Sequence, residues 1–253
     1  TSAEYFGSSV AIDGDTVVVG TLRDWVYIFR TTDGGATYGQ VVKLSYGTGA
    51  SVDGFVAIAG GTVVAGAPNG EAAYVFLTSD GGASYAQVAK LTASDGADDY
   101  FGRSVSIDGD TIVIGANQYD NGGSGAVYVF RTSDGWDTHT EIKLTASDGA
   151  AEDAFGYSVA ISGDTVVVAA LRDDDPWDSG SAYVFNTTDG GATYDQVAKL
   201  TAADAGSQDH LGYSVAIAGD VVVVGSSNEA AYIFSPHVAT AESAALGLSL
   251  IHI

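Results

Sequence analysis

The chain of 253 residues contains no cysteine, so disulfide bridges and thiolate metal sites are excluded. It contains only three prolines against 34 glycines, a composition that favours many tight turns over extended linkers. No run of about 18 apolar residues occurs, so we expect no membrane span. Methionine and a recognisable signal peptide are also missing, and we therefore expect a mature or excised piece of a longer protein.

Positive charge is scarce as well. Nine Lys and Arg residues stand against 32 Asp and Glu residues, and the formal net charge is −23. Such a charge repels nucleic acid and anionic membrane surfaces, and it attracts cations and basic partners. The hydrophobic fraction of 46% is still sufficient for a sizeable core. An acidic, lysine-poor composition fits a secreted protein, so we expect an extracellular or cell-surface location.

A repeat organises the sequence. A string related to Ser-Val-Ala-Ile recurs with its valine at Val10, Val56, Val105, Val159 and Val215. The spacing of roughly 50 residues lies in the range of propeller blades. We therefore divide the chain into units of about 1–46, 47–95, 96–148, 149–203 and 204–234, followed by a non-repeat tail, 235–253.

Each unit contains four short apolar runs separated by turn residues. In the third unit the runs read SVSI, TIVIGA, AVYVF and EIKLTA. The second run is apolar on both faces, as expected of a sheet that is covered on both sides. Blades of a β-propeller stack in this way, whereas the repeats of a linear β-solenoid, the rival interpretation, are usually shorter. The sequence predicts an all-β fold, a β-propeller of about five four-stranded antiparallel blades or a fragment of a larger propeller.

The fifth unit departs from the repeat after Phe234. Its expected fourth run is replaced by the string SPHVATAESAALGLSLIHI. Either the last eight residues, LGLSLIHI, supply a substitute fourth strand, or the tail is foreign to the repeat array and forms a short helix. We expect a monomer if the ring of blades is complete, and self-association if its edges are unpaired.

With these residues in view, the units resemble the FG-GAP repeat family in its short-turn form. The pair Phe-Gly stands at Phe6, Phe101 and Phe155, and the string Gly-Ala-Pro begins once, at Gly66. The resemblance covers residues 1 to about 234. It implies a relationship to the propeller of integrin α chains, in which the loop face contacts ligands. The calcium loop of some integrin repeats does not carry over, because the corresponding string IDGDT is too short.

A second string, Asp-Gly-Gly, recurs between the third and fourth apolar runs. It reads TTDGGATY from Thr31 and TSDGGASY from Thr78, and a third copy carries Trp136 where glycine is expected. The string resembles the Asp-box, a hairpin turn on the propeller face away from the ligand. The carboxylate of such a turn accepts backbone N–H bonds, and glycine permits a positive φ. We interpret these loops as structural turns, with the aspartates Asp33, Asp80, Asp134 and Asp189.

The loops expected at the opposite face are variable and acidic, and loops on a rigid scaffold commonly carry function. The carboxylates either form a solvated rim that keeps the protein soluble or bind a cation or ligand. A calcium site would involve Asp173, Asp175 and Asp178. The candidate ligand contacts are Asp98, Asp99, Asp120, Glu152, Asp153, Asp173, Asp174, Asp175, Trp177 and Asp209.

No catalytic motif is visible in the sequence. It contains neither a Gly-x-Ser-x-Gly elbow nor a His-Glu-x-x-His string, so we expect no enzyme. We expect a binding or adhesion module for a protein or glycan ligand, with no certain cofactor, no nucleic acid partner and no membrane insertion. The alternative is a structural repeat segment of a large surface protein, and a propeller glycan hydrolase is the remote third hypothesis.

Overall fold

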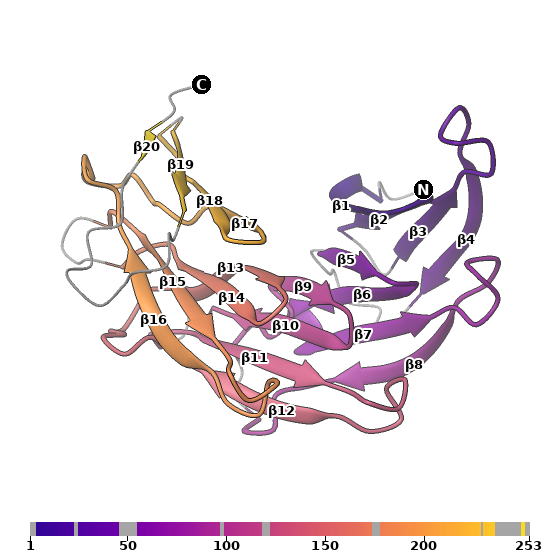
Figure 1. Cartoon of the computed structure of the whole chain (residues 1–253), viewed down its shortest axis with the longest axis horizontal. Helices are drawn as coiled ribbons and strands as arrows, with labels where there is room; N and C mark the ends of the chain where they lie inside the picture. The colour runs from indigo at the N-terminus through magenta and orange to yellow at the C-terminus, as the bar shows by residue number, and fades with distance from the viewer. Residues whose placement is uncertain are drawn as a thin grey trace. The chain divides into compact units, whose positions relative to one another are not determined.

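The computed structural model describes residues 4–22, 25–45, 55–96, 99–117, 122–173, 178–228, 230–235 and 249–250. Within these ranges the regular structure is all-β apart from one 3-10 turn, η1 (Pro68–Gly70). The strands form five four-stranded antiparallel sheets, coloured from indigo to yellow along the chain in Figure 1. The predicted β-propeller blades are thereby confirmed. We number the sheets as blades 1 to 5.

The strands of each blade follow one another in the sequence. Blade 1 comprises β1 (Phe6–Asp13), β2 (Thr16–Thr21), β3 (Trp25–Arg30) and β4 (Gly39–Ser45). Blade 2 comprises β5 (Val56–Ala59), β6 (Thr62–Ala67), β7 (Ala72–Leu77) and β8 (Ala86–Leu91). Blade 3 comprises β9 (Ser104–Asp108), β10 (Thr111–Ala116), β11 (Ala126–Arg131) and β12 (Thr140–Leu144). Blade 4 comprises β13 (Phe155–Ser162), β14 (Thr165–Ala170), β15 (Ser181–Asn186) and β16 (Asp195–Leu200).

Blade 5 is built differently at its outer edge. It comprises β17 (Ser214–Ala218), β18 (Val221–Gly225), β19 (Ala231–Phe234) and β20 (Ser249–Leu250). The two residues of β20 pair with β19, with Leu250 opposite Tyr232. The backbone of the tail thus contributes to this sheet at the position that a full strand occupies in the other blades.

Contacts divide the chain into two compact units. The first contains residues 1–116 and 128–141, and the second contains residues 117–127 and 142–253. Within the first, an apolar cluster joins blades 1 and 2, with Val18, Val26 and Ile28 packed against Val63 and Phe76. All six residues of β6 are buried. The unbroken apolar sequence of β6 is therefore explained by cover on both faces of its sheet.

The Phe-Gly and Gly-Ala-Pro strings meet where blade 3 packs against blade 2. Gly102 has a φ of +101°, and a Cβ there would lie 2.8 Å from the backbone nitrogen of Ala67. A Cβ on Gly66 would in turn collide with the carbonyl oxygen of Gly102. Phe101, next to this contact, is fully buried against Tyr128. Glycine is needed on both sides because the two backbones approach too closely for a side chain.

Candidate functional site

The connections between the strands of a blade lie at its two opposite ends, which we call the turn edge and the loop edge. In blade 4 the turn edge carries the connections at residues 163–164 and 187–194, and the loop edge carries residues 145–154, 171–173 and 178–180. This alternation follows from the antiparallel order of the strands. Among the predicted ligand contacts of blade 4 that the structure describes, Glu152, Asp153 and Asp173 lie at the loop edge, and the Asp-Gly-Gly turn lies at the opposite edge.

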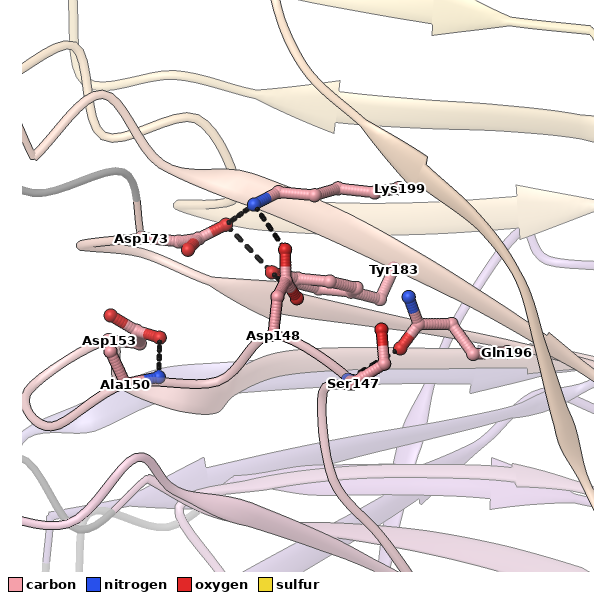
Figure 2. Close-up of polar contacts among 8 residues, drawn as sticks. All are labelled: Ser147, Asp148, Ala150, Asp153, Asp173, Tyr183, Gln196 and Lys199. Atoms are coloured by element: carbon pink, nitrogen blue, oxygen red, sulfur yellow. Dashed lines mark hydrogen bonds and ion pairs between the residues drawn. The ribbon is translucent and has the colours of Figure 1, made fainter. Parts of the chain in front are cut away.

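The loop edge of blade 4 holds a network of charged side chains (Figure 2). Tyr183 of β15 lies opposite Lys199 of β16 in the strand register. The Lys199 ammonium lies 2.9 Å from Oδ2 of Asp148 and 2.6 Å from Oδ2 of Asp173. The Tyr183 hydroxyl lies within hydrogen-bond distance of the same two carboxylates, 2.9 Å from Asp148 and 2.8 Å from Asp173. Two loops are thus fastened to one pair of strands.

The network favours the charged forms of Lys199 and Asp148 in a partly buried place. Burial alone would lower the pKa of Lys199, but its hydrogen bonds to Asp173 and Asp148 outweigh this effect and raise the pKa. Burial alone would raise the pKa of Asp148, but hydrogen bonds from Lys199 and Tyr183 outweigh it and lower the pKa. Burial, with the hydrogen bond to Asp173, raises the pKa of the Tyr183 hydroxyl. The raised pKa favours the protonated form of Lys199, which bridges the two carboxylates.

Asp153 lies beside this network on the loop that precedes β13. Its Oδ2 accepts a hydrogen bond of 2.6 Å from the backbone N–H of Ala150, and the side chain is buried (Figure 2). Burial raises the pKa of Asp153, against the effect of that hydrogen bond, and the nearby carboxylate of Asp173 raises it further. Its carboxylate closes a turn of the loop.

Parts of the same network recur in other blades. Tyr27 donates a hydrogen bond to Glu4, to which Lys43 is also bonded at 2.9 Å. Tyr128 lies 3.0 Å from the carboxylate oxygens of Asp95, and Tyr232 donates to Asp204 at 3.0 Å. In each case a tyrosine of the third strand fastens an acidic residue of the loop that enters the blade.

Sequence reasoning missed this network, although a signal was present. The four lysines of the chain all stand directly before leucine at the end of the fourth apolar run of a unit. They are Lys43, Lys90, Lys143 and Lys199. A residue type confined to one position of a repeat indicates a specific partner, and the tyrosine of the third run stands at an equally regular position.

The structure separates the predicted site residues into buried and exposed groups. The side chains of Asp99, Asp153 and Asp173 are buried. Glu152 is exposed, while Asp209 is half-buried and accepts a hydrogen bond of 2.5 Å from the N–H of Gly206. Five predicted contacts lie outside the described residues, namely Asp98, Asp120, Asp174, Asp175 and Trp177.

The calcium hypothesis receives little support from the part of the chain that the structure describes. No group of three or more His, Asp or Glu side chains there is arranged to hold a metal ion. Asp173 is bonded to the Lys199 ammonium, and Asp175 lies outside the described ranges. Asp178 is half-buried with a φ of +49°. The donor set at Asp173 does not fit a calcium ion, because an ammonium already occupies that carboxylate.

The Asp-Gly-Gly turns at the turn edge share one hydrogen-bond pattern. In blade 1 the carboxylate of Asp33 accepts the N–H of Thr37 at 2.9 Å and its hydroxyl at 2.6 Å. The hydroxyl of Thr31 accepts the N–H of Gly35 at 2.8 Å. Corresponding bonds surround Asp80, Asp134 and Asp189. Hydrogen bonds from Thr37 and Thr31 lower the pKa of Asp33 to about 2.

The third copy keeps this pattern with tryptophan in place of glycine. Trp136 has a φ of +78°, its N–H donates to the hydroxyl of Thr132 at 3.0 Å, and its side chain is buried. The left-handed conformation is unfavourable for tryptophan. Burial of the large ring offsets that cost.

The comparisons with known proteins agree with this architecture. The FG-GAP repeat model matches residues 1–38, 85–130, 139–185 and 194–234. The second unit, with its complete Gly-Ala-Pro string, falls largely outside the matched ranges. No curated protein matches the chain. Among the described residues, no helix is long and apolar enough to cross a membrane.

Proposed function

The chain belongs to the FG-GAP repeat family, and from this premise we propose that it is a non-enzymatic extracellular binding module whose ligand contacts lie on the loop edge of its blades. The observation that supports this proposal is a repeated hydrogen bond that holds the residues of the loop edge to the strands of the blade. In blades 1, 3, 4 and 5 a third-strand tyrosine holds the loop that enters the blade, whereas the loops themselves differ in length and sequence. Binding proteins commonly carry variable loops on a regular, rigid scaffold.

The charges of the loop edge favour a ligand with basic groups. In blades 1 and 4 a lysine is held by loop carboxylates. Exposed acids remain around these contacts, Glu152 and Asp204 among them. A basic segment of a protein ligand is attracted by such a surface, and the attraction weakens with salt. A neutral glycan would bind with little dependence on salt.

The test compares the two edges of one blade. Glu152→Lys changes the loop edge of blade 4, and Asp164→Lys makes the same charge change at an exposed residue of its turn edge. Both variants and the parent protein are applied to a glycan array and to a panel of extracellular-matrix proteins. We expect ligand capture that Glu152→Lys weakens and Asp164→Lys leaves unchanged.

Two outcomes would contradict the proposal. Equal loss in both variants would mean that net charge and not the loop edge governs binding. No capture of any ligand would favour the alternative function, a structural repeat segment in which the acidic loops keep the protein soluble. We assign the Asp-Gly-Gly turns a structural role in either case, because their carboxylates are fully used within the turn.

The calcium hypothesis has its own test. A cation that binds only the folded protein raises the melting temperature. Thermal melts are recorded with millimolar Ca²⁺ and with excess chelator, for the parent protein and for Asp175→Asn. A rise that the chelator reverses and the substitution abolishes would make calcium part of the loop-edge site.

A further inference from the structure

The string Asn186-Thr187-Thr188 is the single Asn-x-Ser/Thr triplet of the chain. The other four asparagines are followed, two residues later, by Glu, Tyr, Gly or Ala. Such a triplet is the acceptor of N-linked oligosaccharides, provided that its middle residue is not proline. A match of three residues arises easily by chance, so the triplet gains weight only from the place of its asparagine in the fold.

Asn186 is the last residue of β15, at the turn edge of blade 4. It lies opposite Thr165 of β14 and opposite Asp195 of β16. Residues directly opposite each other in antiparallel strands share one face of the sheet. On this face Asp195 is exposed, while Asn186 and Thr165 are half-buried. The side chain of Asn186 therefore lies where the face of the blade meets solvent.

The carboxamide of Asn186 does not have the hydrogen bonds expected of a structural asparagine. Its Oδ1 is buried and, within the described part of the chain, has no hydrogen-bond partner. A buried acceptor without a partner lowers stability, and native proteins contain few of them. Blade 2 has leucine, Leu77, at the equivalent end of β7. The packing of the blades therefore does not explain why asparagine stands at this position.

Blade 1 shows what the equivalent side chain can reach. Arg30 follows Ile28, which belongs to a cluster with side chains of blade 2. The Arg30 guanidinium donates to the carbonyl oxygen of Gly81, in the Asp-Gly-Gly turn of that blade. Asn186 follows Val184 in the same way, and Val184 belongs to a cluster with side chains of blade 5. The sequence of the fifth unit has no Asp-Gly-Gly turn, so the group that Arg30 binds has no counterpart for Asn186.

The two threonines of the triplet have separate roles. Thr187 is buried, and its hydroxyl donates to Oδ1 of Asp189 at 2.8 Å and accepts the N–H of Gly191 at 2.8 Å. Thr188 is exposed. The third position is Thr or Ser in all four Asp-Gly-Gly turns, so the asparagine is the residue that creates the triplet in blade 4.

We propose that Asn186 is the acceptor of an N-linked oligosaccharide, transferred from a polyprenyl pyrophosphate carrier as the chain enters a secretory compartment. Nδ2 forms a bond to C1 of the first sugar and releases a proton, while the bond from C1 to the pyrophosphate breaks and the carrier leaves. The proposal shares the secreted location of the proposed function but involves no ligand. Because the turn edge and the loop edge are opposite ends of blade 4, the glycan leaves the loop edge free.

The experiment expresses the full chain behind a cleavable secretion signal in yeast. Cell and medium fractions are analysed by intact mass before and after treatment with peptide N-glycosidase. Asn186→Gln removes the acceptor, Thr188→Ala removes the hydroxyl of the triplet, and Thr188→Ser keeps it. Asn69→Gln, at an exposed asparagine outside such a triplet, is the matched control. Circular dichroism melts of the same proteins made in bacteria, without glycan, verify that each variant folds.

The parent, Thr188→Ser and Asn69→Gln are expected to carry a glycan that the glycosidase removes, leaving aspartate in place of the modified asparagine. Asn186→Gln and Thr188→Ala should lose the glycan completely. Bacterial Asn186→Leu should melt at or above the temperature of the parent, because it removes a buried oxygen without a partner. A parent without glycan in both fractions, a glycan that persists in Asn186→Gln, or a clearly lower melting temperature of Asn186→Leu would each overturn the proposal.

Discussion

Blades 4 and 5 share one contact to the loop that precedes them, but they differ in the other contacts of their outer strands. In both, a third-strand tyrosine holds an acidic loop residue, Tyr183 with Asp148 and Tyr232 with Asp204. Blade 4 adds Lys199, which joins a second carboxylate, and a fourth strand of six residues. Blade 5 has leucine opposite its tyrosine and a fourth strand of two residues.

The comparison separates the contacts that the two blades share from those that only blade 4 has. The tyrosine contact is common to both blades. The lysine and the Asp-Gly-Gly turn are present in blade 4 and absent from the sequence of the fifth unit. We therefore expect blade 5 to open at lower free energy than blade 4, since its sequence lacks the lysine and the Asp-Gly-Gly turn that fix the outer strand of blade 4. Hydrogen exchange of β15 and β19 measures the difference directly.

The largest effect is expected from removing the lysine of blade 4. Lys199→Met would leave the carboxylates of Asp148 and Asp173 together without a cation, at a cost of about 3 kcal/mol in the free energy of unfolding. Urea denaturation measures this loss. Lys90→Met, at an exposed lysine of β8, is the control and should change stability by about 0.5 kcal/mol or less. Equal losses in the free energy of unfolding would show that the network around Lys199 stabilises the protein no more than the exposed Lys90 does.

A smaller effect is expected from the tyrosines that both blades share. Tyr183→Phe removes a hydroxyl between two carboxylates and should cost about 2 kcal/mol, as for a hydrogen bond to a charged group. Tyr232→Phe removes a bond to the exposed Asp204 and should cost about half as much. Burial and the bond to Asp204 raise the pKa of Tyr232 to about 12, so the hydroxyl stays protonated at neutral pH. A larger loss in Tyr232→Phe would contradict the ranking of the two blades.

The turn that blade 5 lacks should make blade 4 sensitive to acid. Hydrogen bonds from Thr193 and Thr187 lower the pKa of Asp189, so its ionised form stabilises the fold. That contribution is complete above the ordinary aspartate pKa of about 3.9 and is lost as the pH falls below it. Asp189→Asn should lower the melting temperature at neutral pH and flatten its decline in acid. An unchanged acid profile would show that the carboxylate contributes nothing through its charge.

The smallest effect is a gain of stability at Asp153. Burial raises the pKa of its carboxyl, so the ionised form is disfavoured in the folded protein above that pKa. Asp153→Asn keeps an oxygen for the N–H of Ala150 and should raise the melting temperature slightly at neutral pH. The gain should vanish as the pH falls below about 3.9, where the parent residue is protonated in both states. The exposed neighbour Glu152, changed to Gln, is the control and should show no such dependence.

The sequence allowed the blades to be predicted because their signals are local. Alternating and continuous apolar runs, and a glycine with positive φ in the hairpin after Asp13, need no knowledge of distant residues. The Phe-Gly and Gly-Ala-Pro strings pointed to the family in the same way. Their physical meaning was not predictable, since Gly66 and Gly102 are far apart in the sequence and meet only when two blades pack.

The candidate site was predicted less well, for a related reason. Asp153 and Asp173 read as exposed loop carboxylates in the sequence, but both are buried, and Asp173 bonds to a lysine that follows it by about half a repeat. Their burial results from loops that fold back onto the third and fourth strands. The composition and spacing of the residues predict neither how these loops fold nor that Lys199 is the partner of Asp173.

The sequence by itself determined the all-β repeat, its turns and its family, because strand periodicity and turn chemistry are properties of neighbouring residues. Only the tertiary structure decided which carboxylates are occupied and which apolar strands are covered. Val10 and Val159 illustrate the point, since one is exposed and the other buried within the same short string of residues. Burial depends on what packs against a strand, and the strand's own residues do not specify that neighbour.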